Sequence, residues 1–198
     1  MDEQIKIYFA NIKNKSIDTI LSDYKDYIKD KDIQKMERFK FDLNKKQSIV
    51  SSILKNKYVG NELSVNSYGK PISKNILFNV SHSDDYVVIA LSNKYDVGID
   101  IEHIKDNTTD ELINHVCNDL EIQDIKKGDK NKLFYYYWTR KEAILKCKGS
   151  GLINNVKDIL NNNNYLLESF YIDDYVVSIA IDCNQNQNIK FVKEWEYE

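Results

Sequence analysis

The sequence predicts an α+β fold with two similar lobes, and a faint internal repeat is its clearest support. Residues 84–90 (DDYVVIA) resemble residues 173–180 (DDYVVSIA), and Ile-Leu-Lys recurs at residues 53–55 and 144–146. The two offsets, from 84 to 173 and from 53 to 144, are 89 and 91 residues. Such near-equal spacing favours a duplicated unit with a site at the seam between its copies.

Hydrophobic periodicity predicts helices and strands along the whole chain. We expect strands at residues 5–9, 76–80, 86–92, 97–102, 165–171, 175–181 and 189–195. We expect helices at residues 18–39, 44–58, 110–126 and 131–147, the third interrupted near residues 117–119. A turn at residues 68–71 carries the only proline, and Gly149 and Gly151 end the last helix.

Composition excludes several classes of protein. The 198 residues hold no apolar run long enough for a transmembrane helix, and the first residues lack the features of a signal peptide. We therefore expect a cytoplasmic protein with no membrane partner. The three cysteines are scattered, which fits neither a disulfide framework nor a zinc site. A net charge of −3 gives no reason to expect a nucleic acid.

Two basic zones stand out in this acidic chain. Residues 25–57 hold ten Lys and Arg against five Asp and Glu, and residues 140–157 hold five against one. Locally concentrated positive charge indicates an anionic ligand or partner. The plainer alternative, above all for residues 25–31, is a solvated helix face.

The strand at residues 97–102 carries two acids on one side. Val97, Ile99 and Ile101 alternate with Gly98, Asp100 and Glu102, so the two carboxylates share a face and repel each other. A cation relieves that repulsion, and all-oxygen ligands suit Mg²⁺. An ordinary solvated strand face is the alternative.

The helix at residues 131–147 presents a matching face. Trp138, Glu142 and Lys146 follow one another at i, i+4 spacing, which brings a third carboxylate and a lysine to one side. The alternative for Glu142 and Lys146 is a simple helical ion pair, worth roughly 0.2–0.5 kcal/mol.

Four segments, in this order, carry a resemblance to a known family. They are Tyr68–Pro71 (YGKP), Phe78–Ser83 (FNVSHS), Gly98–Glu102 (GIDIE), and Trp138–Lys146 (WTRKEAILK) followed by Gly149–Leu152. With them, the chain resembles the 4′-phosphopantetheinyl transferase superfamily, specifically the two-lobed type that activates peptide and polyketide synthases.

The resemblance implies transfer of the phosphopantetheine arm of coenzyme A to a serine of an acyl or peptidyl carrier protein. It implies Mg²⁺ as cofactor and adenosine 3′,5′-bisphosphate as by-product. It also implies two lobes in a pseudo-twofold arrangement with the active site in the cleft between them. Residues 1–96 would bind the nucleotide end of coenzyme A, and residues 97–198 would carry the metal site and the catalytic helix. Because the seam is internal, we expect a monomer.

The resemblance also suggests roles for individual residues. The expected metal ligands are Asp100, Glu102 and Glu142, and Glu142 is also a candidate acceptor of the serine proton. Lys146 would contact the pyrophosphate and assist the leaving phosphate, and Lys141 a phosphate or the carrier. The expected coenzyme A contacts are Ser81, His82, Lys31 and Lys35 at the 3′-phosphate, and Lys70 at the adenosine end. For His82 the alternative is an ordinary turn histidine.

The chain departs from the family pattern after Arg38-Phe39, where relatives often carry a helical arginine. Lys45, Lys46 and Gln47 stand there instead, and the sequence does not choose among them. Glu121 resembles an acid of the relatives, with Asp119 as its competitor. The same stretch carries Val116, Leu120 and Ile125, which are expected to form an apolar ridge for a carrier helix.

Two other functions remain open at this point. One is a Mg²⁺-dependent phosphohydrolase or nucleotidyltransferase that uses Asp100, Glu102 and Glu142 without a carrier. The other is a coenzyme A or carrier-binding module that has lost transfer, which would predict a missing metal ligand, and none is missing.

Overall fold

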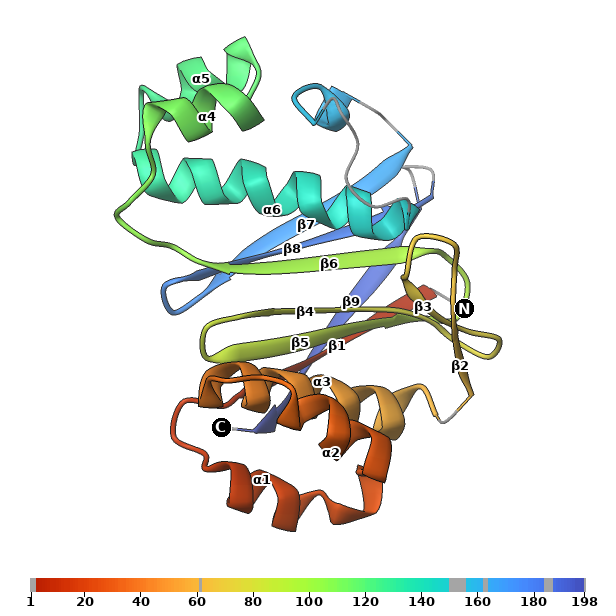
Figure 1. The fold of residues 1–198 in the computed structure, drawn as a ribbon. Coiled ribbons are helices and arrows are strands. Elements are labelled where there is room, and N and C mark those ends of the chain that lie inside the picture. Colours follow the sequence, from red (N-terminus) through yellow and green to blue (C-terminus); the bar gives the residue numbers. More distant parts are fainter. Residues whose placement is uncertain (1–2, 61, 150–155, 162–163, 184–186, 198) are drawn as a thin grey trace.

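Two β-sheets form the centre of the protein, and helices cover their outer faces (Figure 1). The computed structural model describes residues 3–60, 62–149, 156–161, 164–183 and 187–197. The first sheet has the order β4 (Leu77–Ser83), β5 (Tyr86–Ser92), β1 (Glu3–Asn11), β9 (Ile189–Tyr197). The second has the order β6 (Val97–His103), β8 (Tyr175–Asp182), β7 (Tyr165–Ile172). A hairpin of β2 (Leu63–Val65) and β3 (Pro71–Ser73) stands apart from both.

The helices divide between the two sheets (Figure 1). On the first sheet lies α3 (Asp42–Tyr58), and α1 (Ile17–Asp23), the 3₁₀ turn η1 (Lys25–Tyr27) and α2 (Asp30–Glu37) pack against α3. On the second lies α6 (Lys130–Lys148), with α4 (Asp110–Val116) and α5 (Asp119–Ile125) on its outer side and a short turn η2 (Ile159–Asn161). None of the described helices is both long and apolar enough to cross a membrane.

The predicted helix at residues 18–39 is in fact three pieces, and helix capping explains why. Ser16 accepts the Thr19 amide at the start of α1. At the start of α2, the Lys29 backbone N–H donates to Asp32 Oδ2 at 3.1 Å, so a second helix begins there. The predicted interruption near residues 117–119 is confirmed, because Asn118 caps α5 as a separate helix.

Strand periodicity places the hydrophobic cores. The inner faces of the two sheets pack against each other in a central core. Its buried side chains include Ile5, Ile7 and Phe9 of β1 and Val97, Ile99 and Ile101 of β6. The opposite faces of β1 and β5 pack against α3, and β8 packs against α6, so the layers run helix, sheet, sheet, helix.

The α+β class is confirmed, and the internal repeat is visible in the fold. The path β1, α3, β4, β5 has its counterpart in β6, α6, β7, β8, with the same strand order in each sheet. The repeated DDY segments form equivalent two-residue turns, with φ of 39° at Asp84 and 48° at Asp173. They contact each other reciprocally: Tyr86 Oη donates to Asp173 Oδ2 at 2.7 Å, and the Asp85 amide donates to Tyr175 Oη at 3.2 Å.

The last strand departs from the expected division at residue 96. After β7 and β8 complete the second sheet, β9 returns to the first and pairs in parallel with β1. Glu196 on β9 accepts hydrogen bonds from Lys57 and Tyr58 of α3. The first lobe therefore includes the end of the chain, a long-range pairing that local patterns do not encode.

Candidate active site

The candidate site lies where β4 of the first lobe meets β6 of the second. Both are edge strands, and they belong to different sheets. Side chains of β4 bridge the two strands. Asn79 Oδ1 accepts the Ile99 amide at 3.0 Å, and Ser81 Oγ donates to Asp100 Oδ1 at 2.9 Å. The two lobes are thus joined by polar side chains at the position of the acidic strand.

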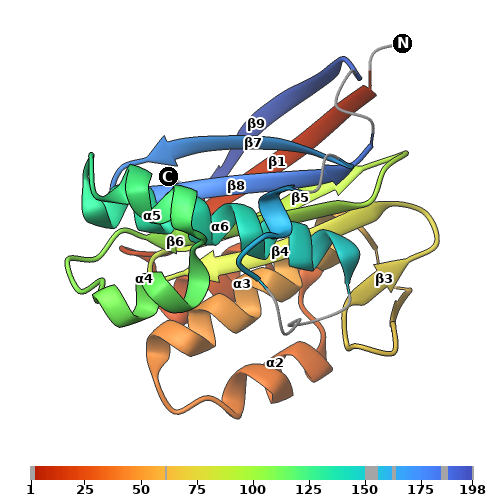
Figure 2. The same cartoon turned by 90° about the horizontal axis from the view of Figure 1, so that it is seen from above.

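Helix α6 lies against β6, as Figure 2 shows. Gly98 permits this contact, because a Cβ at this position would lie 2.0 Å from the Ala143 carbonyl oxygen and 2.3 Å from the Cys147 nitrogen. The absent side chain brings the helix backbone close to the strand. Glu142 and Lys146 are thereby placed beside the acids of β6.

The three predicted carboxylates influence one another electrostatically. Burial, followed by the negative charge of Asp100, raises the pKa of Glu102 above its ordinary value. Burial, Asp100 and Glu102 likewise raise the pKa of Glu142, while Lys146 opposes this. The Trp138 side chain makes a smaller contribution that opposes this rise in the pKa of Glu102, so Trp138 lies near the same acids. Asp100, Glu102 and Glu142 therefore lie within electrostatic range of one another, and their role as metal ligands stays a prediction.

Lys146 is the cation that sits among these acids. Its Nζ lies 2.5 Å from Asp100 Oδ1 and 2.9 Å from Ser81 Oγ. Because the ammonium group can only donate, Ser81 accepts from Lys146 and donates to Asp100. A residue from each of β4, β6 and α6 therefore meets at one point.

The donor chemistry of this cluster fits Mg²⁺. Within the described part of the chain, Asp100 Oδ2 is buried and has no hydrogen-bond partner, as expected of an oxygen that binds a cation. The available groups are carboxylate oxygens, the ligands that Mg²⁺ prefers. In this structure Lys146 is the cation bonded to Asp100, and no three His, Cys, Asp or Glu side chains among the described residues are arranged to hold a metal.

The predicted nucleotide residues on β4 lie beside this cluster. The strand was expected to end at residue 80, but it extends to Ser83. Ser81 and His82 therefore belong to the strand and not to a turn. Partial desolvation, with smaller contributions from Lys146 and Lys35, lowers the pKa of His82. His82 is thus within the electrostatic influence of both α6 and α2.

Lys55, to which the sequence analysis gave no role, lies within electrostatic range of Lys31 and Lys35. Burial and the positive charges of Lys35 and Lys31 lower the pKa of Lys55 to about 8, against a smaller opposing effect of Asp32. Lys55 belongs to α3, where helical periodicity alone gave it no special position. Lys31, Lys35 and Lys55 therefore form one basic cluster.

The hairpin β2–β3 closes one end of the site. Lys70 Nζ donates to the Cys147 carbonyl at 3.0 Å, and Asn66 Nδ2 donates to the Gly149 carbonyl at 2.9 Å. These bonds cap the C-terminal end of α6, so Lys70 has a structural role that the sequence did not predict. Lys70 also lines a cavity of about 320 Å³ together with Tyr68, Asn79, Glu142 and Lys146. Residues 150–152 of the predicted motif lie outside the described residues.

Lys141 does not lie at this cavity, contrary to expectation. It is fully buried, and its Nζ donates to Glu121 Oε2 at 2.7 Å and to the carbonyls of Val116 and Lys157. Glu121 also accepts the Asn118 amide in a capping box of α5. Both residues therefore organise the second lobe. Of the two acids considered for this region, Glu121 and Asp119, it is Glu121 that binds Lys141 of α6.

Burial corrects the predicted apolar ridge, and hydrogen bonding bears on the open choice among Lys45, Lys46 and Gln47. Val116 and Ile125 are buried, and of the predicted apolar ridge only Leu120 is exposed, at 75%. Gln47 donates to the Asp84 carbonyl at 2.9 Å and Lys46 to the Ile12 carbonyl at 3.4 Å. Two of the three candidates for the missing arginine thus contact the protein backbone.

Comparison with known proteins supports the predicted resemblance. The model of the 4′-phosphopantetheinyl transferase superfamily matches residues 96–183, which include β6 and α6. The chain is 35% identical over 118 residues to 4′-phosphopantetheinyl transferase gsp of Aneurinibacillus migulanus, covering 54% of this chain and 49% of that protein. It is 34% identical over 95 residues to 4′-phosphopantetheinyl transferase Sfp of Bacillus subtilis, covering 45% of this chain and 42% of that protein. It is 32% identical over 96 residues to 4′-phosphopantetheinyl transferase HetI of Nostoc, covering 43% and 40%. The chain thus spans about half or less of the length of these curated relatives.

Proposed function

We propose that the chain is a member of the 4′-phosphopantetheinyl transferase superfamily, and that it transfers the 4′-phosphopantetheine arm of coenzyme A to a serine of an apo carrier protein. The observation that carries the proposal is the meeting of Ser81, Asp100 and Lys146 beside a cavity. That arrangement combines oxygen ligands for a cation with a lysine suited to phosphate.

Coenzyme A would bind through its anionic groups. We assign the 3′-phosphate to Ser81, His82, Lys31 and Lys35, with Lys55 as an added source of positive charge. Lys70 borders the cavity and would lie near the adenosine end. Lysines provide compact, movable donors for such oxygens.

Asp100, Glu102 and Glu142 would hold Mg²⁺, which when bound neutralises negative charge at the pyrophosphate. Asp100 would contact the ion in place of Lys146, and the Lys146 ammonium group would then be available to bind the pyrophosphate.

The chemical step is a phosphoryl-group displacement by the carrier serine. The serine oxygen forms a bond to the phosphorus next to pantetheine, and the bond to the bridging oxygen breaks, releasing adenosine 3′,5′-bisphosphate. Glu142 accepts the serine proton, a role that its raised pKa supports. Lys146 stabilises the negative charge that develops on the leaving phosphate.

The proposed partners are coenzyme A and an acyl or peptidyl carrier protein. We propose a monomer, because the repeated sheets already bury their inner faces against each other. Neither a nucleic acid nor a membrane enters the reaction, and the cytoplasm is the proposed location.

Mass measurement of an apo carrier tests this function. The carrier is incubated with the protein, coenzyme A and Mg²⁺, and we expect it to gain one phosphopantetheine. The carrier should gain no phosphopantetheine when Mg²⁺ is omitted and a chelator is present. The Asp100→Ala variant should also leave the carrier unmodified, while its melting curve keeps the transition of a folded protein. Nucleotide hydrolysis without carrier modification would favour the phosphohydrolase. Coenzyme A binding without transfer would favour the binding module.

A further inference from the structure

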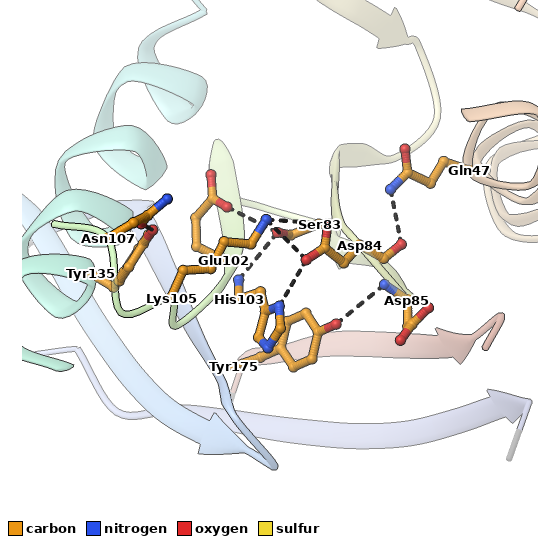
Figure 3. Close-up of polar contacts among 10 residues, drawn as sticks. All are labelled: Gln47, Ser83, Asp84, Asp85, Glu102, His103, Lys105, Asn107, Tyr135 and Tyr175. Atoms are coloured by element: carbon orange, nitrogen blue, oxygen red, sulfur yellow. Dashed lines mark hydrogen bonds and ion pairs between the residues drawn. The ribbon is translucent and has the colours of Figure 1, made fainter. Parts of the chain in front are cut away.

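Ser83 lies two residues beyond Ser81 on β4 and bridges two groups of β6 (Figure 3). Its Oγ is 2.9 Å from Glu102 Oε2 and 3.1 Å from the His103 backbone nitrogen. A backbone amide can only donate, so the hydroxyl accepts from His103 and gives its single hydrogen to Glu102. The direction of both bonds is therefore set by chemistry.

The turn that follows holds Ser83 in place. Asp84 Oδ2 lies 2.7 Å from His103 Nδ1 and 3.0 Å from Lys105 Nζ, and its carbonyl accepts the Gln47 side chain at 2.9 Å. Figure 3 shows these contacts around one turn, with groups from both lobes. Ser83 itself is buried. Its hydroxyl is thus a fixed donor and not an adjustable surface group.

Glu102 needs such a restraint because of its position. It is a flexible side chain beside Asp100, and repulsion between the two carboxylates favours rotamers that turn Glu102 away. The Ser83 hydroxyl offsets this by binding one of the two Glu102 oxygens. Ligating carboxylates are commonly oriented by such outer hydrogen bonds, whose removal typically weakens metal binding by 10–100-fold.

We propose that Ser83 is a positioning residue, which holds the Glu102 carboxylate toward Asp100 so that the divalent cation binds with both acids. The proposal rests on the proposed function for the identity of the cation site. Ser83 touches neither the substrate nor the cation in this proposal. It acts only through its hydrogen bond to Glu102.

Metal binding and transfer are measured separately to test this. Mn²⁺ binding is followed by electron paramagnetic resonance, with and without coenzyme A, and the half-saturating Mg²⁺ concentration is taken from carrier modification. We expect Ser83→Ala to weaken Mn²⁺ binding about tenfold and to raise half-saturating Mg²⁺ similarly, with kcat near wild type at saturating Mg²⁺. Ser83→Thr, which keeps the hydroxyl, should restore both values to within about twofold.

Ser92→Ala is the matched control. Ser92 is also a buried serine, whose hydroxyl accepts the Tyr95 amide at 3.0 Å, but it lies at the far end of β5. This variant should leave Mn²⁺ binding unchanged. If Ser83→Ala does not fold, Ser83→Cys, with similar volume and a weaker donor, should shift Mn²⁺ binding in the same direction.

Several results would overturn the positioning role. They are wild-type Mn²⁺ affinity in Ser83→Ala or Ser83→Cys, an equal loss in Ser92→Ala, failure of Ser83→Thr to restore binding, or no Mn²⁺ binding by the wild type. If the wild type binds Mn²⁺ in a Ser83-dependent way but leaves the carrier unmodified, the proposed transferase function fails while the positioning role stands.

Discussion

The Nζ of Lys141 lies 2.7 Å from Oε2 of Glu121, and both side chains are enclosed by protein. The lysine also donates to the carbonyls of Val116, at the end of α4, and of Lys157. One ammonium group of α6 thus joins α4, α5 and a later segment of the chain. We therefore expect the stability of the second lobe to depend on this pair.

Lys141→Met should therefore lower the free energy of unfolding by about 3–5 kcal/mol, because it leaves the Glu121 carboxylate buried without its partner. Chemical denaturation measures the loss. The double variant Lys141→Met, Glu121→Gln should recover part of it. Lys130→Met, on the same helix but in an exposed pair with Asp110, serves as control and should change stability little. Equal losses of unfolding free energy in Lys141→Met and Lys130→Met would contradict this role of Lys141.

Glu142→Gln should stabilise the metal-free protein at neutral pH. The pKa of Glu142 is raised above its ordinary value of 4.5, chiefly by burial and then by Asp100. A raised pKa in the folded state contributes stability below the unfolded pKa, and that contribution is lost as pH rises through the folded pKa. At pH 7 the ionised carboxylate therefore destabilises the fold, and the amide removes this cost.

Melting curves in chelator at pH 7 and below pH 4.5 check the sign. The melting temperature of Glu142→Gln should exceed that of the wild type at pH 7, and the gain should disappear at the lower pH. Glu168→Gln, at an exposed position of β7, should show no such gain. A lower melting temperature for Glu142→Gln at pH 7 would show that the charged form is favourable.

Gly98→Ala should destabilise the protein by about 3 kcal/mol, the upper part of the range for overpacked cores. Its Cβ would meet backbone atoms of Ala143 and Cys147, which cannot rotate away. We expect transfer activity to fall as well, since α6 must move from β6. At Gly128 a new Cβ meets only the flexible Leu133 side chain, so Gly128→Ala is the control and should cost less. Comparable melting temperatures for the two variants would argue against close packing of α6.

Lys146→Ala should lower kcat at least tenfold, about 1.4 kcal/mol, with a smaller change in coenzyme A affinity. The reason is that its charge acts on the departing phosphate more strongly than on the bound substrate. Steady-state kinetics over a Mg²⁺ series and separate calorimetry measure the two effects. Lys148→Ala, on the exposed side of the same helix, is the control. Equal losses in affinity and turnover would make Lys146 a phosphate anchor only.

Coenzyme A should bind more tightly than its 3′-dephospho form, and His82→Ala should reduce the difference. The motivation is the proximity of His82 to the charges of Lys35 and Lys146. Calorimetry with both ligands and both proteins decides the point. An undiminished preference in His82→Ala would place the 3′-phosphate at other residues.

Local patterns predicted those parts of the site that lie within single elements. Alternation placed Val97, Ile99 and Ile101 in the core and left Asp100 to face the site, and i, i+4 spacing brought Lys146 to it. Lys141 was assigned the wrong role because its surroundings come from α4 and α5, which no period within α6 reveals. Ser83 was missed for a related reason, since its partners belong to the other lobe.

The pairing of β1 with β9 also constrains how the protein is made. Ile5 lies opposite Phe191, so β1 receives its outer neighbour only after the residues between the two strands have left the ribosome. Until then, β1 presents an unpaired backbone edge, which is a hazard for association with other chains. Such a long loop closure slows folding. Completion of the first sheet therefore follows synthesis of the second lobe.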